Sequence, residues 1–254
     1  MLHPRIIPCL LVKNQGLVKT VKFKDPKYIG DPINAVKIFN EKKVDELVVL
    51  DVDASVDNRE PDYKLIENIA AECRMPLCYG GGIKTVDHVI KTISLGVEKV
   101  AIGSAAITES NLIYEASKMV GAQSIVVVFD VKIRFGKYEV YINNGEKRVK
   151  KSLLELVEEA ENNGAGEIII NSIDNDGVMK GYDLKLVGEV RNKINIPLTV
   201  LGGAGSLDDI KKLFSNFQQI GAAIGSMFVY KGKYKAVLIN YPSSKQKKSL
   251  FKVS

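Results

Sequence analysis

The sequence of 254 residues contains no tryptophan, only two histidines and only three cysteines. The histidines, His3 and His88, lie far apart, and no zinc-ligand spacing, Ser-His-Asp triad or P-loop motif accompanies them. Cys9, Cys73 and Cys78 are odd in number and form no CxxC pair, which is typical of a reducing cytoplasm. We therefore expect a cytoplasmic protein with no bound metal ion and no cofactor.

Long apolar runs are also missing, because none approaches the roughly 20 residues of a membrane span. The N-terminus enters a predicted strand almost at once, which leaves no room for a signal peptide. The net charge is +6 and the pI about 9.0, but the lysines are spread out and are dense only in a basic C-terminal tail at about 243–254. No aromatic-plus-basic stretch of the kind that stacks bases stands out. We therefore expect neither a membrane nor a nucleic-acid partner, whereas acidic or phosphorylated small molecules fit the charge.

Short β-rich runs recur eight times along the chain, at residues 5–12, 46–52, 76–82, 99–104, 124–131, 167–174, 197–205 and 221–228. Most lack polar–apolar alternation, which is typical of parallel strands covered on both faces. Helical patterns fill most of the gaps, with start signals at Asp31, Ser152 and Ser206. This alternation predicts one domain over 1–254, a (β/α)8 TIM barrel, with a doubly wound open sheet as the alternative.

An internal repeat supports the barrel. Residues 45–55 resemble 166–177, residues 79–91 resemble 201–212, and residues 100–107 resemble 222–229. The offsets between the paired segments are nearly constant, so a half-barrel of four βα units has been doubled. The repeat predicts two similar ligand sites at the rim of the barrel, one in each half.

Glycine and serine residues end the repeated strands at both of these positions. Glycine allows backbone N–H groups to approach an anion closely, and such loops commonly bind phosphate in TIM barrels. The alternative is that tight turns merely need glycine, but two turns in register favour a ligand with phosphate at both ends. The candidates are Gly81, Gly82, Gly103 and Ser104 in the first half and Gly202, Gly203, Gly225 and Ser226 in the second.

Carboxylates also follow the predicted strands. Asp51 ends the second strand, Asp130 ends the fifth, and "SIDNDG" places Asp174, Asp176 and Gly177 after the sixth. Carboxylates at such positions act as general acids or bases, or bind hydroxyl groups, but they also cap helices and form turns. For "DNDG" a turn role and a ligand role stay equally open. Asp130 precedes a long excursion instead of a helix, which favours a catalytic role.

Several motifs, in order, resemble the family of HisF, the cyclase subunit of imidazole glycerol phosphate synthase. They are "RIIPCL", "GDP", "DELVVLD", "GGGI", "GVEKVAIGSAAI", "GAGEIIINSIDNDG", "GYD" and "GGAG", and they span about residues 5–228. The resemblance implies a TIM barrel that receives ammonia from a separate glutaminase, HisH, and binds a bisphosphorylated substrate across its mouth. It also implies that Asp130 is catalytic, that Lys19 lies in a mobile loop at the site, and that Asp51 and Asp176 face the substrate.

One position departs from the family at the mouth. The family motif continues the first strand with an aspartate, the second catalytic carboxylate, where this chain has Leu11. Leucine cannot transfer a proton, and loss of one positioned acid or base typically costs roughly 10²–10⁴ in rate. The resemblance therefore leaves the intrinsic cyclase activity in doubt.

The opposite end of the barrel matches the family. Arg5, Glu46, Lys99 and Glu167 begin four of the predicted strands, and the resemblance implies that they form a charged gate for ammonia. The alternative is that charges at the bottom of a TIM barrel serve stability alone. Glu98, next to this ring, is a candidate residue for docking the glutaminase.

Three functional hypotheses follow. A preserved inlet with an altered mouth resembles a branch of HisF homologues that support amidino-sugar formation in surface polysaccharides, together with a HisH-like glutaminase and a separate amidotransferase. Ammonia supply for amidotransfer to a phosphosugar-type acceptor is therefore the first hypothesis. The second is a true cyclase–lyase of histidine biosynthesis, and the third is a non-enzymatic barrel that binds a phosphorylated ligand.

Overall fold

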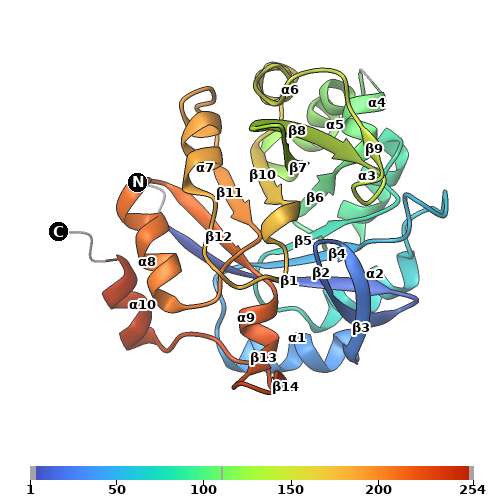
Figure 1. Cartoon of the computed structure of the whole chain (residues 1–254). Coiled ribbons are helices and arrows are strands. Elements are labelled where there is room, and N and C mark those ends of the chain that lie inside the picture. Colours follow the sequence, from blue (N-terminus) through green and yellow to red (C-terminus); the bar gives the residue numbers. More distant parts are fainter. Residues whose placement is uncertain (1–3, 110, 252–254) are drawn as a thin grey trace.

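Eight parallel strands form a closed barrel in the computed structural model, which describes residues 4–109 and 111–251 (Figure 1). They are β1 (Arg5–Lys13), β4 (Leu47–Asp51), β5 (Leu77–Gly80), β6 (Lys99–Ile102), β7 (Ile125–Arg134), β10 (Glu167–Ser172), β11 (Leu198–Leu201) and β12 (Ile220–Ile224). Each strand pairs in parallel with the next, and β12 pairs back to β1. The predicted TIM barrel is therefore confirmed, and the doubly wound open sheet is excluded.

Helices cover the outside of the barrel. They are α1 (Pro32–Glu41), α2 (Tyr63–Glu72), α3 (Val86–Ser94), α4 (Ser104–Thr108), α5 (Leu112–Val120), α6 (Leu153–Asn162), α7 (Leu184–Arg191), α8 (Leu207–Asn216), α9 (Ser226–Val229) and α10 (Ser244–Phe251), with 3-10 turns η1 (Ala122–Ser124) and η2 (Ile173–Asn175). The three predicted helix starts are confirmed, because Asp31 caps α1, and Ser152 and Ser206 form capping boxes with Glu155 and Asp209.

Side chains inside the barrel form layers because alternate residues of a strand point to the same face. A charged layer lies at the strand starts and a cavity at the strand ends. Between them lies an apolar cluster made of Ile7, Cys9, Val48, Cys78, Ala101, Val126, Ile169, Leu201 and Ala223. A second, larger core joins the strands to the helices and includes the fully buried rings of Phe39, Phe129 and Phe228. Burial of each such ring contributes about 1.5–3 kcal/mol relative to exposure.

Three hairpins lie at the mouth, two after barrel strands and one after helix α9. The segment after β1, predicted as a loop, forms an antiparallel hairpin of β2 (Gly16–Val21) and β3 (Lys24–Gly30). β7 continues into β8 (Lys137–Ile142) and β9 (Lys147–Arg148), and α9 is followed by β13 (Tyr230–Lys231) and β14 (Ala236–Val237). The loop prediction was wrong because lysines interrupt the β pattern. Lys22, Lys24 and Lys27 are exposed in the turn and in β3, whereas Lys19 is buried in β2.

The C-terminal segment packs on the barrel as helix α10. The Phe251 ring lies 5.7 Å from that of Phe214 on α8, and Leu250 is buried. Lys247 pairs with Asp45 at 2.5 Å, next to the start of β4. Lys252, which contributes to the predicted basic tail, and His3 lie outside the described residues. Residues 244–251 thus use part of their basic charge to hold the helix in place.

We expect Ser206→Ala to lower the free energy of unfolding by about 1 kcal/mol, because the Asp209 backbone N–H loses its acceptor at the start of α8. Ser215→Ala is the matched control on the same helix, since its hydroxyl donates to the Lys211 carbonyl and caps no N–H group. Urea unfolding followed by circular dichroism gives both values. Equal destabilisation by the two substitutions would contradict the capping role.

Candidate functional site

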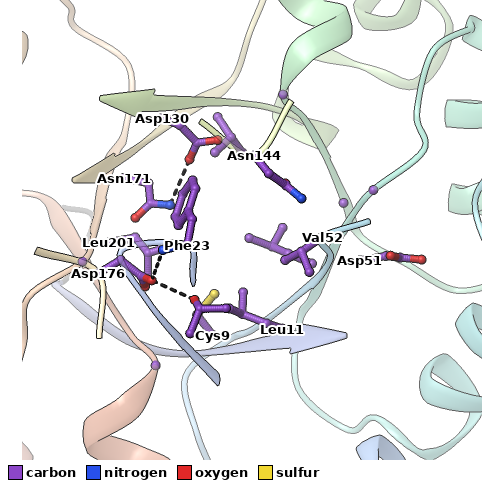
Figure 2. Close-up of a pocket in the computed structure, with 18 of the residues that line it drawn as sticks. Cys9, Leu11, Phe23, Asp51, Val52, Asp130, Asn144, Asn171, Asp176 and Leu201 are labelled. Atoms are coloured by element: carbon purple, nitrogen blue, oxygen red, sulfur yellow. Dashed lines mark hydrogen bonds between the residues drawn. The ribbon is translucent and has the colours of Figure 1, made fainter. Parts of the chain in front are cut away.

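A cavity of about 570 Å³ lies at the mouth of the barrel, a size typical of ligand pockets (Figure 2). Twelve of the thirteen residues predicted to bind or act on a ligand line it: Lys19, Asp51, Gly81, Gly103, Ser104, Asp130, Asp176, Gly177, Gly202, Gly203, Gly225 and Ser226. Gly82 does not line the cavity. Its φ is +74°, and a Cβ there would lie 2.8 Å from the backbone of Glu60 and Pro61, so packing explains this glycine.

The two halves of the barrel shape the rim alike. Gly103 before α4 has φ −97° and ψ −104°, and Gly225 before α9 has φ −97° and ψ −88°. Gly81 and Gly203, in contrast, have positive φ, and a Cβ on either would meet backbone oxygen at 2.5 Å or less. The chain geometry therefore requires glycine at Gly81 and Gly203. A Cβ on Gly103 would meet no atom within 4 Å, so that position is open to the cavity.

Asp130 ends the inward row of β7 and lies directly beside Asn171 of β10. The Asn171 side-chain amide donates to Asp130 Oδ1 at 2.9 Å (Figure 2). Burial raises the pKa of Asp130 to about 7, partly opposed by the Asn171 hydrogen bond and reinforced by the negative charge of Asp176. A carboxyl group with this pKa exchanges a proton near neutral pH, as a general acid or base requires.

Asn171 is a site residue that sequence reasoning missed. Its side chain is buried, and its Oδ1 has no hydrogen-bond partner among the described residues. A buried acceptor without a partner is costly, so a donor on a bound ligand would be stabilised at this atom. The only available signal was its inward position two residues after Ile169, and that signal depends on the strand register.

Lys19 lies on a strand and not in a loop. It lies on β2, is buried, and donates from Nζ to the Cys9 backbone carbonyl at 2.7 Å. Burial lowers the pKa of Lys19, opposed by Cys9 and Asp176. A Cβ on Gly225 would lie 2.8 Å from Nζ, so Lys19 adjoins the rim of the second half-barrel. A cation there can attract an anionic ligand.

Two of the predicted carboxylates hold the loops of the mouth. Asp176 accepts from Thr20 Oγ1 at 2.8 Å and from the Phe23 backbone N–H at 3.3 Å, which fastens the β2–β3 hairpin. Asp51 accepts two hydrogen bonds from Arg59 at 3.3 Å and caps the turn after β4. Asp174, with a hydrogen bond from the Ile133 N–H at 2.8 Å, fits the turn reading of "DNDG".

Leu11 presents an apolar side chain to the cavity. It packs with Leu50 and Val128 on the barrel's inner apolar cluster, and the same cavity wall includes Leu201 (Figure 2). The position where the family resemblance expects a second carboxylate is therefore part of an apolar wall. Asp130 has an amide and not a second acid as its hydrogen-bond partner.

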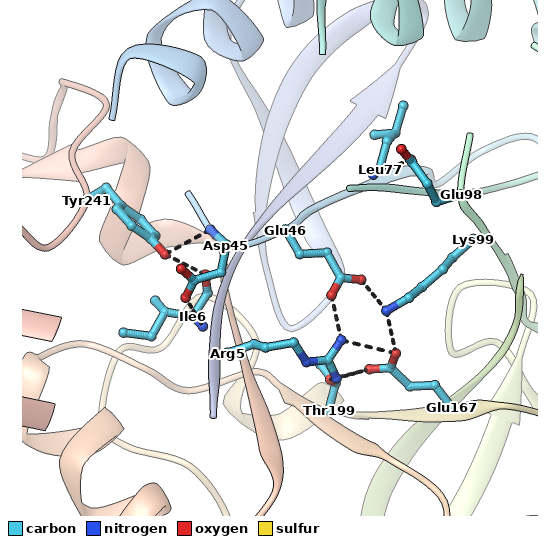
Figure 3. A network of polar contacts seen from close by, with 10 residues as sticks. All are labelled: Arg5, Ile6, Asp45, Glu46, Leu77, Glu98, Lys99, Glu167, Thr199 and Tyr241. Atoms are coloured by element: carbon cyan, nitrogen blue, oxygen red, sulfur yellow. Dashed lines mark hydrogen bonds and ion pairs between the residues drawn. The ribbon is translucent and has the colours of Figure 1, made fainter. Parts of the chain in front are cut away.

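The four charged residues at the opposite end form one ring (Figure 3). Arg5 pairs with Glu46 at 2.5 Å and with Glu167 at 2.7 Å, and Lys99 pairs with both glutamates at 2.8 Å. Thr199 also donates to Glu167 at 2.6 Å. Burial acts to raise the pKa of Glu167, but Arg5 and Lys99 outweigh it and lower the pKa. Every ion of the ring is therefore paired, and the charges sum to zero.

Glu98 lies beside this ring at the start of β6. Its side chain is on the exposed surface, and one carboxylate oxygen accepts from the Leu77 backbone N–H at 2.7 Å (Figure 3). The second oxygen is available to a partner on this face.

The three cysteines are free thiols, and Cys9 and Cys78 are buried. In residues 4–109 and 111–251, no group of three or more His, Cys, Asp and Glu side chains is arranged to hold a metal ion. No helix in the same residues combines the length and apolar composition that crossing a bilayer requires.

Comparison with known proteins gives a consistent result. The family model described as "Histidine biosynthesis protein" matches residues 5–235. A Vibrio vulnificus protein that carries the provisional name imidazole glycerol phosphate synthase subunit hisF3 is 57% identical over 250 residues, covering 98% of this chain and 96% of its own. A Pseudomonas aeruginosa protein provisionally named subunit hisF2 is 52% identical, covering 95% and 97%. The imidazole glycerol phosphate synthase subunit HisF of Natranaerobius thermophilus is 40% identical, covering 96% and 98%.

We expect Asp130→Asn to stabilise the protein more at pH 8 than at pH 5. The folded carboxyl keeps its proton up to about pH 7, whereas the unfolded one ionises near pH 4, so ionisation weakens the fold as the pH rises. The gain should reach up to about 1.4 kcal/mol for each pH unit in that interval. Urea unfolding at both pH values measures it, with the exposed Asp57→Asn as control. A gain independent of pH would contradict the raised pKa.

Proposed function

The chain belongs to the HisF family of histidine biosynthesis proteins, and we propose that it is a cyclase-type synthase subunit that takes ammonia from a HisH-like glutaminase. The names of its relatives fit imidazole glycerol phosphate synthase better than sugar amidotransfer, so the order of the first two hypotheses is reversed. In this proposal the glutaminase binds the face that carries the charged ring, and Glu98 contributes to docking.

The observation that carries the proposal is the position of the ring opposite the cavity. The ring spans the barrel at the starts of β1, β4, β6 and β10, and the cavity lies at the ends of the same strands. Ammonia is small and neutral, so it can pass a constriction of paired charges that would exclude a larger or charged substrate. A ring with two buried glutamates and two half-buried cations is not needed for stability alone, since apolar residues of similar volume often stabilise a protein equally well.

Two features of the rim favour the binding of a phosphorylated ligand. The Gly103–Ser104 and Gly225–Ser226 steps have the same backbone shape in the two halves, and the buried Lys19 adjoins the second. Backbone N–H groups near glycine and a nearby cation together favour an anion. In this proposal a phosphate group binds at each rim position, and the ligand spans the cavity between them past Asp130.

Leu11 favours a second candidate function, ammonia supply for amidotransfer to a phosphosugar-type acceptor. With an apolar wall at this position, Asp130 alone would have to serve both proton-transfer steps of a cyclase. An ammonia-supplying barrel does not need the second carboxylate. A separate amidotransferase would then make the new bond.

The second candidate function predicts little imidazole product from ammonium and the bisphosphate substrate of the synthase, and a rise in turnover of about 10²–10⁴ for Leu11→Asp. The introduced carboxylate would provide the missing proton-transfer group. Leu11→Asn is the matched control, because it has nearly the same shape without an ionisable group. Product formation is followed by chromatography. Turnover by the unchanged protein at roughly 1–10³ s⁻¹ would show that Leu11 does not lower the cyclase rate. That result would favour the synthase function over the second candidate.

We expect Lys99→Ala to reduce transfer of amide nitrogen from glutamine to product, because it leaves Glu46 and Glu167 partly unpaired and disrupts the gate. The measurement follows ¹⁵N from labelled glutamine, with the glutaminase present and unlabelled ammonium in competition. Lys211→Ala, on the surface of α8, is the control.

The same variant also tests the stability alternative. Breaking a buried pair typically costs 3–5 kcal/mol, so unfolding is measured in parallel. A folded Lys99→Ala barrel that transfers label as well as the unchanged protein would make the ring a purely stabilising feature.

A further inference from the structure

Three hairpins surround the mouth of the barrel. We call residues 16–30, 132–148 and 230–238 the mouth hairpins (Figure 1). Phe23 and Asn144, in the turns of the first two, both line the mouth cavity, and the Phe23 ring lies beside Gly145. The first and third enclose a second cavity of about 510 Å³, which shares Lys19, Thr20, Gly177 and Ser226 with the first. The hairpins therefore form one continuous rim.

The mouth hairpins carry more than the whole net charge of the protein. They contain twelve lysines and arginines against three aspartates and glutamates, a net charge of +9, whereas the entire chain has +6 and the remainder therefore −3. Among the described residues only one of the twelve forms an ion pair, Arg148 with Glu139. The basic pI is thus a local property of this face. Apart from the buried Lys19, which donates to the Cys9 carbonyl, and the paired Arg148, its cations can meet acidic groups.

The same hairpins display the most exposed large apolar side chains of residues 4–109 and 111–251. Phe135 is 94% exposed, Tyr234 is 91% exposed and Tyr28 is 71% exposed, and each belongs to a different mouth hairpin. Ile133, Val21, Val237 and Leu238 are also exposed on these hairpins. Attraction of a small anion needs the lysines but not the aromatic side chains.

Phe135 is held in an unfavourable backbone conformation. It forms a two-residue turn with Gly136, with φ +48° and +75°, a turn that favours asparagine followed by glycine. A bulky residue at positive φ is an outlier, and the exposed Phe135 ring gains only a stacking contact with Arg134 at 5.6 Å. The fold would be served better by asparagine here, which points to a role for the ring outside the fold.

We propose that the mouth hairpins are a docking surface for another protein, one that presents acidic residues around an apolar centre. Tyrosine and phenylalanine at the apices would be the anchors, and the unpaired lysines would attract and orient the partner. The second cavity, lined by Tyr28, Tyr230 and Tyr234 with Lys27 and Lys233, is large enough to take a carboxylate or aromatic side chain of that partner.

This inference rests on the proposed function in one respect. If ammonia reaches the cavity from the ring, an open mouth would lose it to water, and a protein seated on the hairpins would receive it instead. A protein is favoured over a nucleic acid because the three anchors project from separate hairpins, two of them beside the second cavity, and do not form one groove along which a strand could run.

The test uses a photo-crosslinking amino acid at position 135 or 234 of the full-length protein in its own cells, with position 114 as the control. Tyr114 is 52% exposed, on α5 outside the mouth hairpins. We expect positions 135 and 234 to crosslink to the same acidic protein and position 114 not to. Crosslinks to nucleic acid, to a second copy of this chain or to unrelated proteins at the two positions would overturn the proposal.

Binding of the purified partner then gives the energetic test. Phe135→Asn and Tyr234→Ser should each weaken binding at least tenfold, and Tyr114→Ser should not. Lys233→Glu with Lys235→Glu should weaken it further and reduce its salt dependence, relative to Lys211→Glu with Lys212→Glu on α8. Because Phe135→Asn suits the turn, its unfolding free energy should not fall, which separates docking from folding.

The two proposals can fail separately. If ¹⁵N from glutamine is transferred normally to product but positions 135 and 234 crosslink to no common partner, the docking surface alone is overturned. A partner that binds the hairpins while Lys99→Ala leaves transfer unchanged would retain the docking surface as an interface and remove the ammonia channel.

Discussion

The register of the closed barrel is the constraint on which the other features depend. Because β12 pairs back to β1, each strand has one fixed neighbour on each side, and alternate side chains have no choice of face. On β1 this places Arg5 in the ring and Leu11 at the mouth, with Ile7 and Cys9 between them. A shift by one residue would bring Ile6 and Leu10 inside and would destroy the ring and the cavity together.

The side chains inside the barrel therefore change in chemical character along the barrel axis. Paired ions form the floor, an apolar cluster fills the middle, and a mixed wall with one titrating carboxyl group encloses the mouth. The pKa of Asp130 is raised to about 7 because the carboxyl group is buried, next to the apolar inward residues Val126 and Val128 of the same strand. The burial that encloses a ligand in the cavity therefore also raises the pKa of Asp130. A change in this burial would alter both the enclosure and the pKa.

The sequence was informative where local rules apply. Residues close in the sequence were enough to recognise the strand runs, the capping residues such as Ser206 and the doubled glycine pattern. It was less informative where contacts are distant. Asn171 is important because it donates a hydrogen bond to Asp130, 41 residues away. Gly82 must be glycine because the backbone of Glu60 and Pro61 packs against it. The mouth hairpins were missed for the same reason, because each basic and aromatic stretch, such as residues 230–235, is short, and only the barrel brings the three stretches to one rim.

The ring also has a consequence for the order of synthesis and folding. Arg5 leaves the ribosome before its partners Glu46, Glu167 and Thr199, which lie 41, 162 and 194 residues later. Tyr241, which donates to the Ile6 carbonyl at 2.8 Å, is separated from it by 235 residues. Strand β1 therefore cannot complete its contacts with Glu167 and Tyr241 until those residues have emerged, so the barrel closes late.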